Sequence, residues 1–272
     1  MPRFKTIVEY DGTNYHGWQY QPNVLTIQGE IEKALKKLFH VRIPVYGAGR
    51  TDAGVHAHGQ VTHLIAPWKH PAQNLKNALN ALLPKDICIK NISEIDDKFH
   101  ARYSAISKTY QYQILNQKLR SPLKRLYSWQ VSQELDLEKL QNAANLLVGV
   151  HDFSTFGSPT SGTSSTVREI FKTQWELKEE HSVLIFSICG SGFLRSMVRS
   201  LVGTLVNVGS GKMSVQDFGF ILKSCDRSKA GPTAPAEGLS LISVWFMKNA
   251  CYDDETQETP IFEPVFLARN EP

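Results

Sequence analysis

An arginine, a threonine and an aspartate stand together in a glycine-rich stretch of the first half of the chain. The stretch runs from 45 to 57 and reads Val-Tyr-Gly-Ala-Gly-Arg-Thr-Asp-Ala-Gly-Val-His-Ala. Three glycines within eight residues disfavour a helix or a regular strand. An apolar run at 41–45 precedes them and an alternating run at 60–65 follows, which predicts a tight loop with Arg50, Thr51 and Asp52 at its tip. A nearby guanidinium keeps a carboxylate ionised, so Asp52 is a candidate for acid–base or nucleophilic chemistry. An aspartate in such a turn is also a common turn former.

Histidines close to this loop offer a second interpretation. His56, His58 and His63, with Asp52 as a fourth ligand, have the residue types of a metal-dependent hydrolase. His58 and His63 fall on opposite pleats of a strand, however, so we expect no metal there. The four cysteines, at positions 88, 189, 225 and 251, lack paired spacing and predict free thiols in a reducing cytoplasm.

Two residues of the second half are further candidates. Tyr110 alternates with Tyr112 and Ile114, a pattern typical of one face of a strand. Arg195 and Arg199 are four residues apart and would share one face of the helix predicted over 193–206.

Charge is distributed unevenly along the chain. The 272 residues carry a formal net charge of +4, but residues 250–272 alone sum to −5, which leaves +9 on residues 1–249. A basic body with aromatic side chains suits a polyanionic partner such as RNA. No apolar run approaches the roughly 20 residues that span a bilayer, and no signal-peptide core follows Met1, so no membrane partner is expected.

The elements that must position these residues follow from hydrophobic periodicity and capping signals. In the first half we predict strands at 4–10, 41–46, 60–65 and 87–95, a helix capped by Thr26, and a helix from Pro71 with Leu75, Ala78, Leu79 and Leu82 inward. In the second half we predict strands at 107–115, 167–177, 183–189 and 240–246, and helices capped by Asp136, over 193–206, and from a capping box at Ser214 and Asp217. Residues 227–238 read as a surface loop.

Both halves therefore read β-α-β-β-α-β, the ferredoxin-like order of an α+β protein. We expect two such halves, 1–104 and 105–249, to share a mixed, mainly antiparallel sheet with a central basic cleft. The acidic residues 250–272 would form a separate tail.

The octapeptide Arg-Thr-Asp-Ala-Gly-Val-His-Ala at 50–57 resembles the signature of the TruA family of tRNA pseudouridine synthases. Further blocks resemble the same family, at 10–13, 17–19, 99–102, 107–112, 151–153, 166–170, 193–199 and 231–239. The resemblance reaches almost to Phe246, and the acidic tail matches no part of the family pattern. Members of the family often have histidine at the position of Ser196, and some have it at the position of Arg195.

This resemblance implies the pseudouridine synthase fold and the isomerisation of uridine to pseudouridine at positions 38, 39 and 40 of the tRNA anticodon stem–loop. By the family pattern Asp52 is the catalytic residue, Arg199 pairs with it, and Tyr110 stacks on the target uracil. Arg50 would hold the carboxylate ionised or fill the space left by the flipped base. The family implies a homodimer, a cytoplasmic location and no cofactor.

A non-catalytic RNA-binding protein on the same sheet is the alternative from another class. Basic residues with interleaved aromatics, which suit phosphate contacts, would serve either function; they are Arg102, Lys108, Lys118, Arg120, Lys124 and Arg125 with Tyr103, Tyr127 and Trp129, and then Lys212, Lys223, Arg227 and Lys229.

Overall fold

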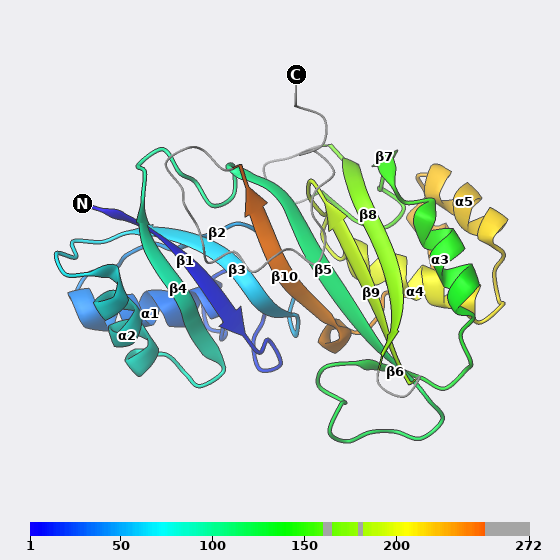
Figure 1. Cartoon of the computed structure of the whole chain (residues 1–272), viewed down its shortest axis with the longest axis horizontal. Coiled ribbons are helices and arrows are strands. Elements are labelled where there is room, and N and C mark those ends of the chain that lie inside the picture. Colours follow the sequence, from blue (N-terminus) through cyan, green and yellow to red (C-terminus); the bar gives the residue numbers. More distant parts are fainter. Residues whose placement is uncertain (160–164, 179–181, 248–272) are drawn as a thin grey trace. The chain divides into compact units, whose positions relative to one another are not determined.

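The computed structural model of the chain describes residues 1–159, 165–178 and 182–247. These contain ten strands and five α-helices (Figure 1), which confirms the expected α+β class. The described residues divide into two units: unit 1 contains 1–106 and 241–247, and unit 2 contains 107–240. The predicted acidic tail, 250–272, lies outside the described residues.

Unit 1 is a sheet with two helices, and its order follows the predicted strand–helix–strand–strand–helix–strand pattern. Its elements are β1 (Arg3–Tyr10), α1 (Ile27–Phe39), β2 (Tyr46–Gly47), β3 (His56–Ile65), α2 (Ala72–Leu82) and β4 (Ile87–Ile95), with β10 (Leu239–Phe246) added from the end of the chain. The strand order is β4-β1-β3-β10, and β2 pairs with β3. β1 is antiparallel to both β3 and β4, and α2 packs along β4 and against α1.

The predicted start of α1 is confirmed in detail. Thr26 has an extended backbone and its hydroxyl accepts from the N–H of Gly29 at 3.2 Å. This satisfies an N–H that has no partner within the helix. Ile27, Ile31 and Leu35 form the buried stripe, so capping and periodicity together determined this helix.

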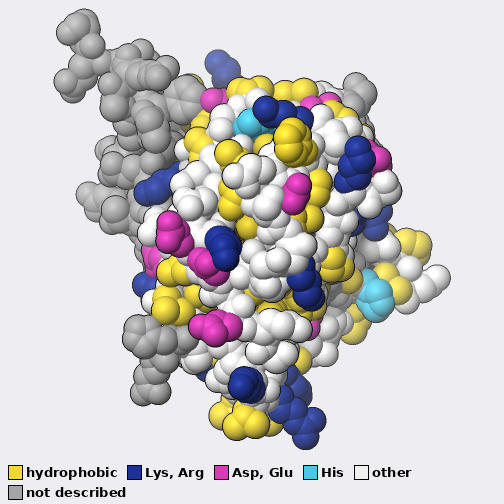
Figure 2. All heavy atoms as spheres, turned by 90° about the vertical axis from the view of Figure 1, so that its right-hand side faces the viewer, with side chains coloured by type: hydrophobic (Ala, Val, Ile, Leu, Met, Phe, Trp, Pro, Cys, Tyr) yellow, Lys and Arg dark blue, Asp and Glu magenta, His cyan; other side chains and the backbone are white. Residues whose placement is uncertain are grey.

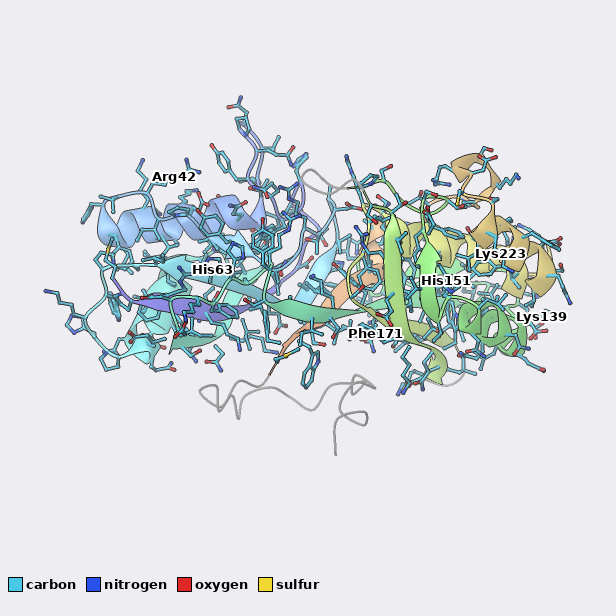
Figure 3. All side chains as sticks on the ribbon, turned by 90° about the horizontal axis from the view of Figure 1, so that it is seen from above. Arg42, His63, Lys139, His151, Phe171 and Lys223 are labelled. Atoms are coloured by element: carbon cyan, nitrogen blue, oxygen red, sulfur yellow. The ribbon has the colours of Figure 1, made fainter. Side chains whose placement is uncertain are left out.

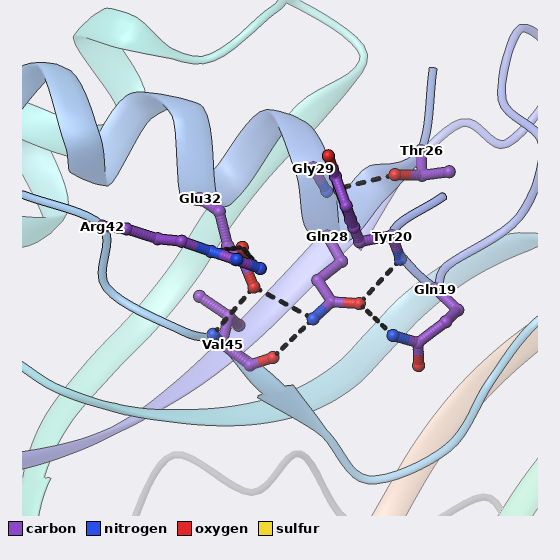
Figure 4. A network of polar contacts seen from close by, with 8 residues as sticks. All are labelled: Gln19, Tyr20, Thr26, Gln28, Gly29, Glu32, Arg42 and Val45. Carbon is purple, nitrogen blue, oxygen red and sulfur yellow. Dashed lines mark hydrogen bonds and ion pairs between the residues drawn. The ribbon is translucent and has the colours of Figure 1, made fainter. Parts of the chain in front are cut away.

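The strand predicted over 41–46 is wrong apart from Tyr46, because helix side chains occupy the backbone groups that a strand would pair. The N–H of Val45 donates to Glu32 at 3.2 Å, and its carbonyl accepts from Gln28 at 3.0 Å. Figure 4 shows both contacts, together with Arg42 donating to the Glu32 carboxylate at 3.2 Å. The segment leading to the glycine-rich loop is therefore fixed to α1.

The apolar face predicted for α2 is half right. Leu75 and Leu79 are completely buried, but Leu82 is 37% exposed and Ala78 only partly covered. The helix ends at Leu82, so its last turn extends past the surface that buries Leu79.

Unit 2 contains five further strands and three helices. Its elements are β5 (Ala105–Asn116), β6 (Trp129–Val131), α3 (Leu137–Asn145), β7 (Gly149–Asp152), β8 (Val167–Lys178), β9 (Val183–Gly190), α4 (Met197–Gly209) and α5 (Val215–Lys223), followed by the 3₁₀ turns η1 (Arg227–Lys229) and η2 (Ala236–Gly238). The strand order is β5-β9-β8-β7, with β6 parallel to β5 and the pairs β5–β9, β9–β8 and β8–β7 antiparallel. The short strands β6 and β7 were not predicted.

The helix caps of unit 2 are confirmed, but the predicted start of α4 is wrong. Asp136 caps α3, and Ser214 and Asp217 form the expected capping box of α5. α4 begins at Met197 and not at Phe193, because Ser196 has a left-handed backbone (φ 57°) and Arg195 pairs with Ser158 in an isolated β-bridge. The four residues before Met197 approach the helix in irregular structure.

Candidate active site

The glycine-rich loop is anchored to β3 at its start. The N–H of Ala48 donates to the carbonyl of Val61 at 2.8 Å, and the Gln60 side chain donates to the carbonyl of Gly49 at 2.9 Å. β3 itself begins at His56, so the last two residues of the octapeptide are strand and not loop. Arg50, Thr51 and Asp52 thus lie on a short segment held at both ends by one strand.

Thr51 fixes the tip of the loop to the core of unit 1. It is 7% exposed, and its hydroxyl lies 2.8 Å from the Tyr10 hydroxyl at the end of β1. Burial raises the pKa of Tyr10 well above its ordinary value, so this phenol stays protonated and available for the bond. The N–H of Trp18 donates to the Thr51 carbonyl at 3.1 Å. The residue before Asp52 is therefore held by both its side chain and its backbone.

Asp52 and Arg50 are more exposed to solvent than Thr51. Asp52 is half-buried and Arg50 is exposed. The N–H of Val55 donates to the Asp52 carbonyl at 3.2 Å and closes a turn, in which Gly54 takes the left-handed backbone (φ 77°) that its lack of a side chain allows. The turn that contains Asp52 is thus closed through its backbone carbonyl, with Gly54 supplying the left-handed residue.

The segment 12–18 supports the loop from behind. The N–H of Gly54 donates to the Tyr15 carbonyl at 3.2 Å. A Cβ added to Gly17 would lie 2.6 Å from the Thr51 carbonyl oxygen, and one added to Gly12 would lie 2.0 Å from that of Val55. Both glycines lie in blocks that resemble the family, at 10–13 and 17–19, and these blocks were the signal that could have identified them.

The neighbouring histidines are hydrogen-bond acceptors for loops. His56 Nδ1 accepts from the N–H of Gly12 at 3.1 Å, and His63 Nδ1 accepts from the N–H of Ala101 at 3.2 Å. Both rings are buried, whereas His58 is exposed. Within the described ranges, no group of three or more histidine, cysteine or acidic residues is arranged to hold a metal ion. The three described cysteines, Cys88, Cys189 and Cys225, are free thiols as predicted, and Cys251 lies outside the described residues.

Tyr110 belongs to unit 2 and lies on β5 opposite Ile188 of β9. It is 6% exposed, and its ring meets that of Phe193 edge to face with centroids 5.1 Å apart. Tyr112 lies on the same face of the strand and donates from its hydroxyl to the carbonyl of Pro235 at 2.8 Å.

Arg199 lies in the first turn of α4 and binds the segment 227–239. Its Nε donates to the Ala234 carbonyl at 2.8 Å, and the N–H of Ala234 donates back to the Arg199 carbonyl at 3.1 Å. A Cβ on Gly203, one turn further along α4, would lie 1.7 Å from the Pro232 carbonyl oxygen. Residues 232–234 of the predicted surface loop, 227–238, therefore pack closely against α4, and Ala234 is 1% exposed.

Arg195 and Arg199 do not share a helix face, contrary to our prediction. Arg195 precedes α4, where its N–H donates to the Ser158 carbonyl at 3.1 Å, and its side chain is exposed. Ser196 occupies the N-cap position without a capping side-chain bond. Arg199 is thus the basic residue that α4 itself contributes.

The basic residues of unit 2 do not form a uniform surface. On the face seen in Figure 2, lysine and arginine side chains alternate with aspartate and glutamate. The segment between β5 and β6 has a different composition, in which basic residues stand beside exposed leucines. Leu119 and Leu123 are 80% and 90% exposed, and the basic residues are at 118, 120, 124 and 125. No helix in the described part of the chain is long and apolar enough to cross a membrane.

Similarity to known proteins identifies the family of this chain. The profile described as "tRNA pseudouridine synthase" matches residues 6–104 and 143–247. Curated relatives named "tRNA pseudouridine synthase A" include one from Thermoanaerobacter sp. (strain X514), 47% identical over 244 residues (90% of this chain and 99% of the relative), and one from Acetivibrio thermocellus, 47% identical over 246 residues (90% and 100%). A chain of a solved Cbf5–Nop10–Gar1 complex aligns with 89% of this chain and 59% of its own length, at 11% identity and a TM-score of 0.35.

These relatives decide between the alternatives that the residues left open. The non-catalytic RNA-binding protein and the metal-dependent hydrolase are set aside, because the profile and the named relatives are those of an isomerase that acts on tRNA. The chain belongs to the TruA family of tRNA pseudouridine synthases.

Proposed function

We propose that this enzyme converts uridine to pseudouridine at positions 38, 39 and 40 of the tRNA anticodon stem–loop, with Asp52 as its catalytic residue. The observation that carries the proposal is that hydrogen bonds fix Thr51, the central residue of the Arg-Thr-Asp tip. Thr51 is locked to Tyr10 and Trp18, and the adjacent Asp52 is half-buried. A rigid support beneath a partly exposed acid is the arrangement that catalysis needs.

The reaction exchanges one glycosidic bond for another. The bond from ribose C1′ to uracil N1 breaks, the base turns, and C1′ bonds to C5; the proton on C5 leaves and N1 gains one. Nothing is oxidised or reduced, so no external oxidant or energy source is required. Asp52 starts the sequence either as a nucleophile at C1′ or C6 or as a base that removes the C2′ proton.

The other residues of the proposed site act on the base and on the charge. A stacked base is out of reach, so the target nucleotide must be flipped before reaction. We assign Tyr110 to stacking on the flipped uracil and Arg199 to pairing with the Asp52 carboxylate. Arg50, exposed beside Asp52, would hold the carboxylate ionised or occupy the space that the base leaves.

We further infer that the enzyme works as a homodimer with one tRNA contacting both subunits. Sedimentation of the full chain at low concentration measures this directly. A monomer that is fully active would contradict it.

Asp52→Asn tests the catalytic assignment, because an amide keeps the shape of the side chain and removes its charge and basicity. The variant should bind an unmodified tRNA transcript as the wild type does and release no tritium from C5-labelled uridine. Asp97→Asn, at an exposed aspartate of the same unit, is the matched control and should turn over normally.

Mass-spectrometric mapping of the tRNA before and after incubation tests the positions. Pseudouridine at 38, 39 or 40 supports the proposal, and pseudouridine confined to other positions overturns the assigned substrate. Measurable turnover by Asp52→Asn would remove Asp52 from its proposed role.

A further inference from the structure

Four rings gather beside β2 and β3 in unit 1, away from the Arg-Thr-Asp tip. Tyr46 stacks on His63 with centroids 5.0 Å apart and planes at 18°, His63 meets His100 at 4.5 Å, and His100 meets Tyr103 at 4.4 Å. Figure 3 labels His63 within unit 1. The rings at the two ends are open to solvent, since Tyr103 is 77% and Tyr46 49% exposed. We call these four residues and Arg102 the Tyr103 patch.

The two histidines form an uncharged and fixed centre for the patch. Burial lowers the pKa of His63 to about 4, together with the repulsion that would act if His100 were protonated too and with the charge of Arg3. Burial and Arg3 also lower the pKa of His100. His63 Nδ1 accepts from the N–H of Ala101 at 3.2 Å, and His100 Nδ1 accepts from the N–H of Arg102 at 3.2 Å. Neutral rings held by backbone donors provide a firm support for the exposed tyrosines.

A cation completes the patch. The Arg102 guanidinium lies 5.7 Å from the centroid of the Tyr103 ring. Another exposed tyrosine of unit 1, Tyr20, also has an arginine over its ring, but there the guanidinium of Arg42 is bound to the Glu32 carboxylate. The charges that act on His100 are those of Arg3 and Arg102, so the Tyr103 patch is positive where the Tyr20 pair is neutralised.

The patch is displaced along β3 from the point where the glycine-rich loop ends. His63 is seven residues from His56, and a strand advances roughly 3.3 Å per residue, which separates these two residues by about 20 Å. We therefore assign the patch to binding and not to the reaction itself.

Exposed aromatic faces beside an arginine fit one kind of ligand well. Every base has a flat face that stacks on tyrosine, and a guanidinium pairs with the neighbouring phosphate. The family acts on tRNA, which favours a nucleotide as the occupant of this patch.

We propose that the Tyr103 patch binds an unpaired nucleotide of the tRNA at a place remote from the reacting uridine, with the base on Tyr103 and its phosphate on Arg102. The inference rests on the proposed function and gives that enzyme a second, non-catalytic contact with its substrate.

Equilibrium binding of an unmodified tRNA transcript to the full chain tests the stacking contact. Tyr103→Ala should weaken binding about tenfold, a typical cost of one lost base–aromatic stack, while kcat at saturating tRNA stays unchanged. Tyr103→Phe keeps the ring and should bind as the wild type does. Phe220→Ala removes a ring of similar exposure (73%) on α5 and should also bind normally. Because Tyr103 is largely exposed, none of these changes should alter the melting temperature appreciably.

The salt dependence of tRNA binding distinguishes the contribution of Arg102 from that of the Tyr103 ring. Arg102→Gln should lower the slope of log Kd against log salt by about 0.7, the value for one phosphate contact on a single strand. Tyr103→Ala should leave that slope unchanged.

Wild-type affinity for Tyr103→Ala overturns the proposal, as does a change in its sedimentation with unchanged tRNA binding, which would make the patch a protein interface. The proposed function fails separately, by the absence of pseudouridine at 38–40 in the wild-type reaction, whatever the patch variants do.

Discussion

Arg199 and Ala234 are joined in both directions across unit 2. The Arg199 Nε donates to the Ala234 carbonyl at 2.8 Å, and the Ala234 N–H returns a bond to the Arg199 carbonyl at 3.1 Å. The next carbonyl along the chain, that of Pro235, accepts from the Tyr112 hydroxyl at 2.8 Å. The orientation of the Arg199 guanidinium therefore depends on a segment that Tyr112 holds against β5.

Tyr112→Phe removes the hydroxyl that fixes Pro235, and we expect Arg199 to lose part of its positioning. One such hydrogen bond contributes about 0.5–1.5 kcal/mol, so kcat should fall roughly two- to tenfold with little change in KM. In the double variant with Arg199→Ala, the Tyr112→Phe change should have no further effect. Single-turnover rates on tRNA give all four values.

Thr173→Val is the matched control for Tyr112→Phe. It removes another buried hydroxyl of unit 2 that donates to a backbone carbonyl, that of Ala144 at 3.0 Å. It should lower stability without lowering kcat. Additive losses in the Tyr112 and Arg199 double variant would show that Tyr112 does not act through Arg199.

Gly17→Ala should damage activity by displacing the Arg-Thr-Asp tip. Gly17 has φ 88°, and an added Cβ would lie 2.6 Å from the Thr51 carbonyl oxygen. A left-handed alanine alone costs roughly 1–2 kcal/mol, and the clash must then move Thr51. We expect a large fall in kcat, measured by tritium release from tRNA.

Gly211→Ala separates strain from displacement. Gly211 is also left-handed (φ 75°), but a Cβ there meets nothing within 4 Å. It should lose comparable stability and keep full activity per folded molecule. Equal activities of the two variants would contradict a role for Gly17 in shaping the loop.

Glu32→Ala should destabilise unit 1, because Glu32 is 6% exposed and its carboxylate accepts from Val45, Gln28 and Arg42. Leaving the N–H of Val45 unpaired costs roughly 1–3 kcal/mol. Urea unfolding measures the loss, and Glu32→Gln, which retains an acceptor oxygen, should lose less. Lys33→Ala breaks the helix pair between the exposed Lys33 and Glu30 and should cost about 0.5 kcal/mol.

Acid should destabilise unit 1 through His63. Its pKa of about 4 in the folded protein lies below the ordinary 6.5, so the unfolded chain takes up a proton that the folded chain resists. The stability is present above pH 6.5 and is lost as the pH falls from 6.5 toward 4, by up to about 1.4 kcal/mol per pH unit.

Urea unfolding at pH 7, 6 and 5 checks this dependence. His63→Gln keeps an acceptor and cannot titrate, so its stability should fall less steeply over this range. His58→Gln, at the exposed histidine of the same strand, should follow the wild type. Parallel curves for His63→Gln and the wild type would refute the assignment.

Local chemistry was readable in the sequence wherever a few neighbouring residues decide the outcome. Thr26, Asp136 and the Ser214–Asp217 pair each cap a helix as predicted, because a cap needs only its own side chain and the next three backbone amides. β4 has the predicted bounds, Ile87–Ile95, since a run rich in isoleucine that follows Pro84 marks the strand without reference to a distant partner. The octapeptide containing Asp52 likewise indicated both the loop and the family.

Tertiary contacts decided the rest. Residues 42–45 have strand propensity, but Glu32 and Gln28 use the hydrogen bonds of Val45, so no strand forms there. α4 starts late because Arg195 pairs with Ser158, far away in sequence. The burial of Thr51 beside a half-buried Asp52 depends on Tyr10 and Trp18, which lie more than thirty residues earlier. A pattern in the sequence records which residues are present, whereas the partner that a backbone or hydroxyl finally takes is set by the packing of the whole unit.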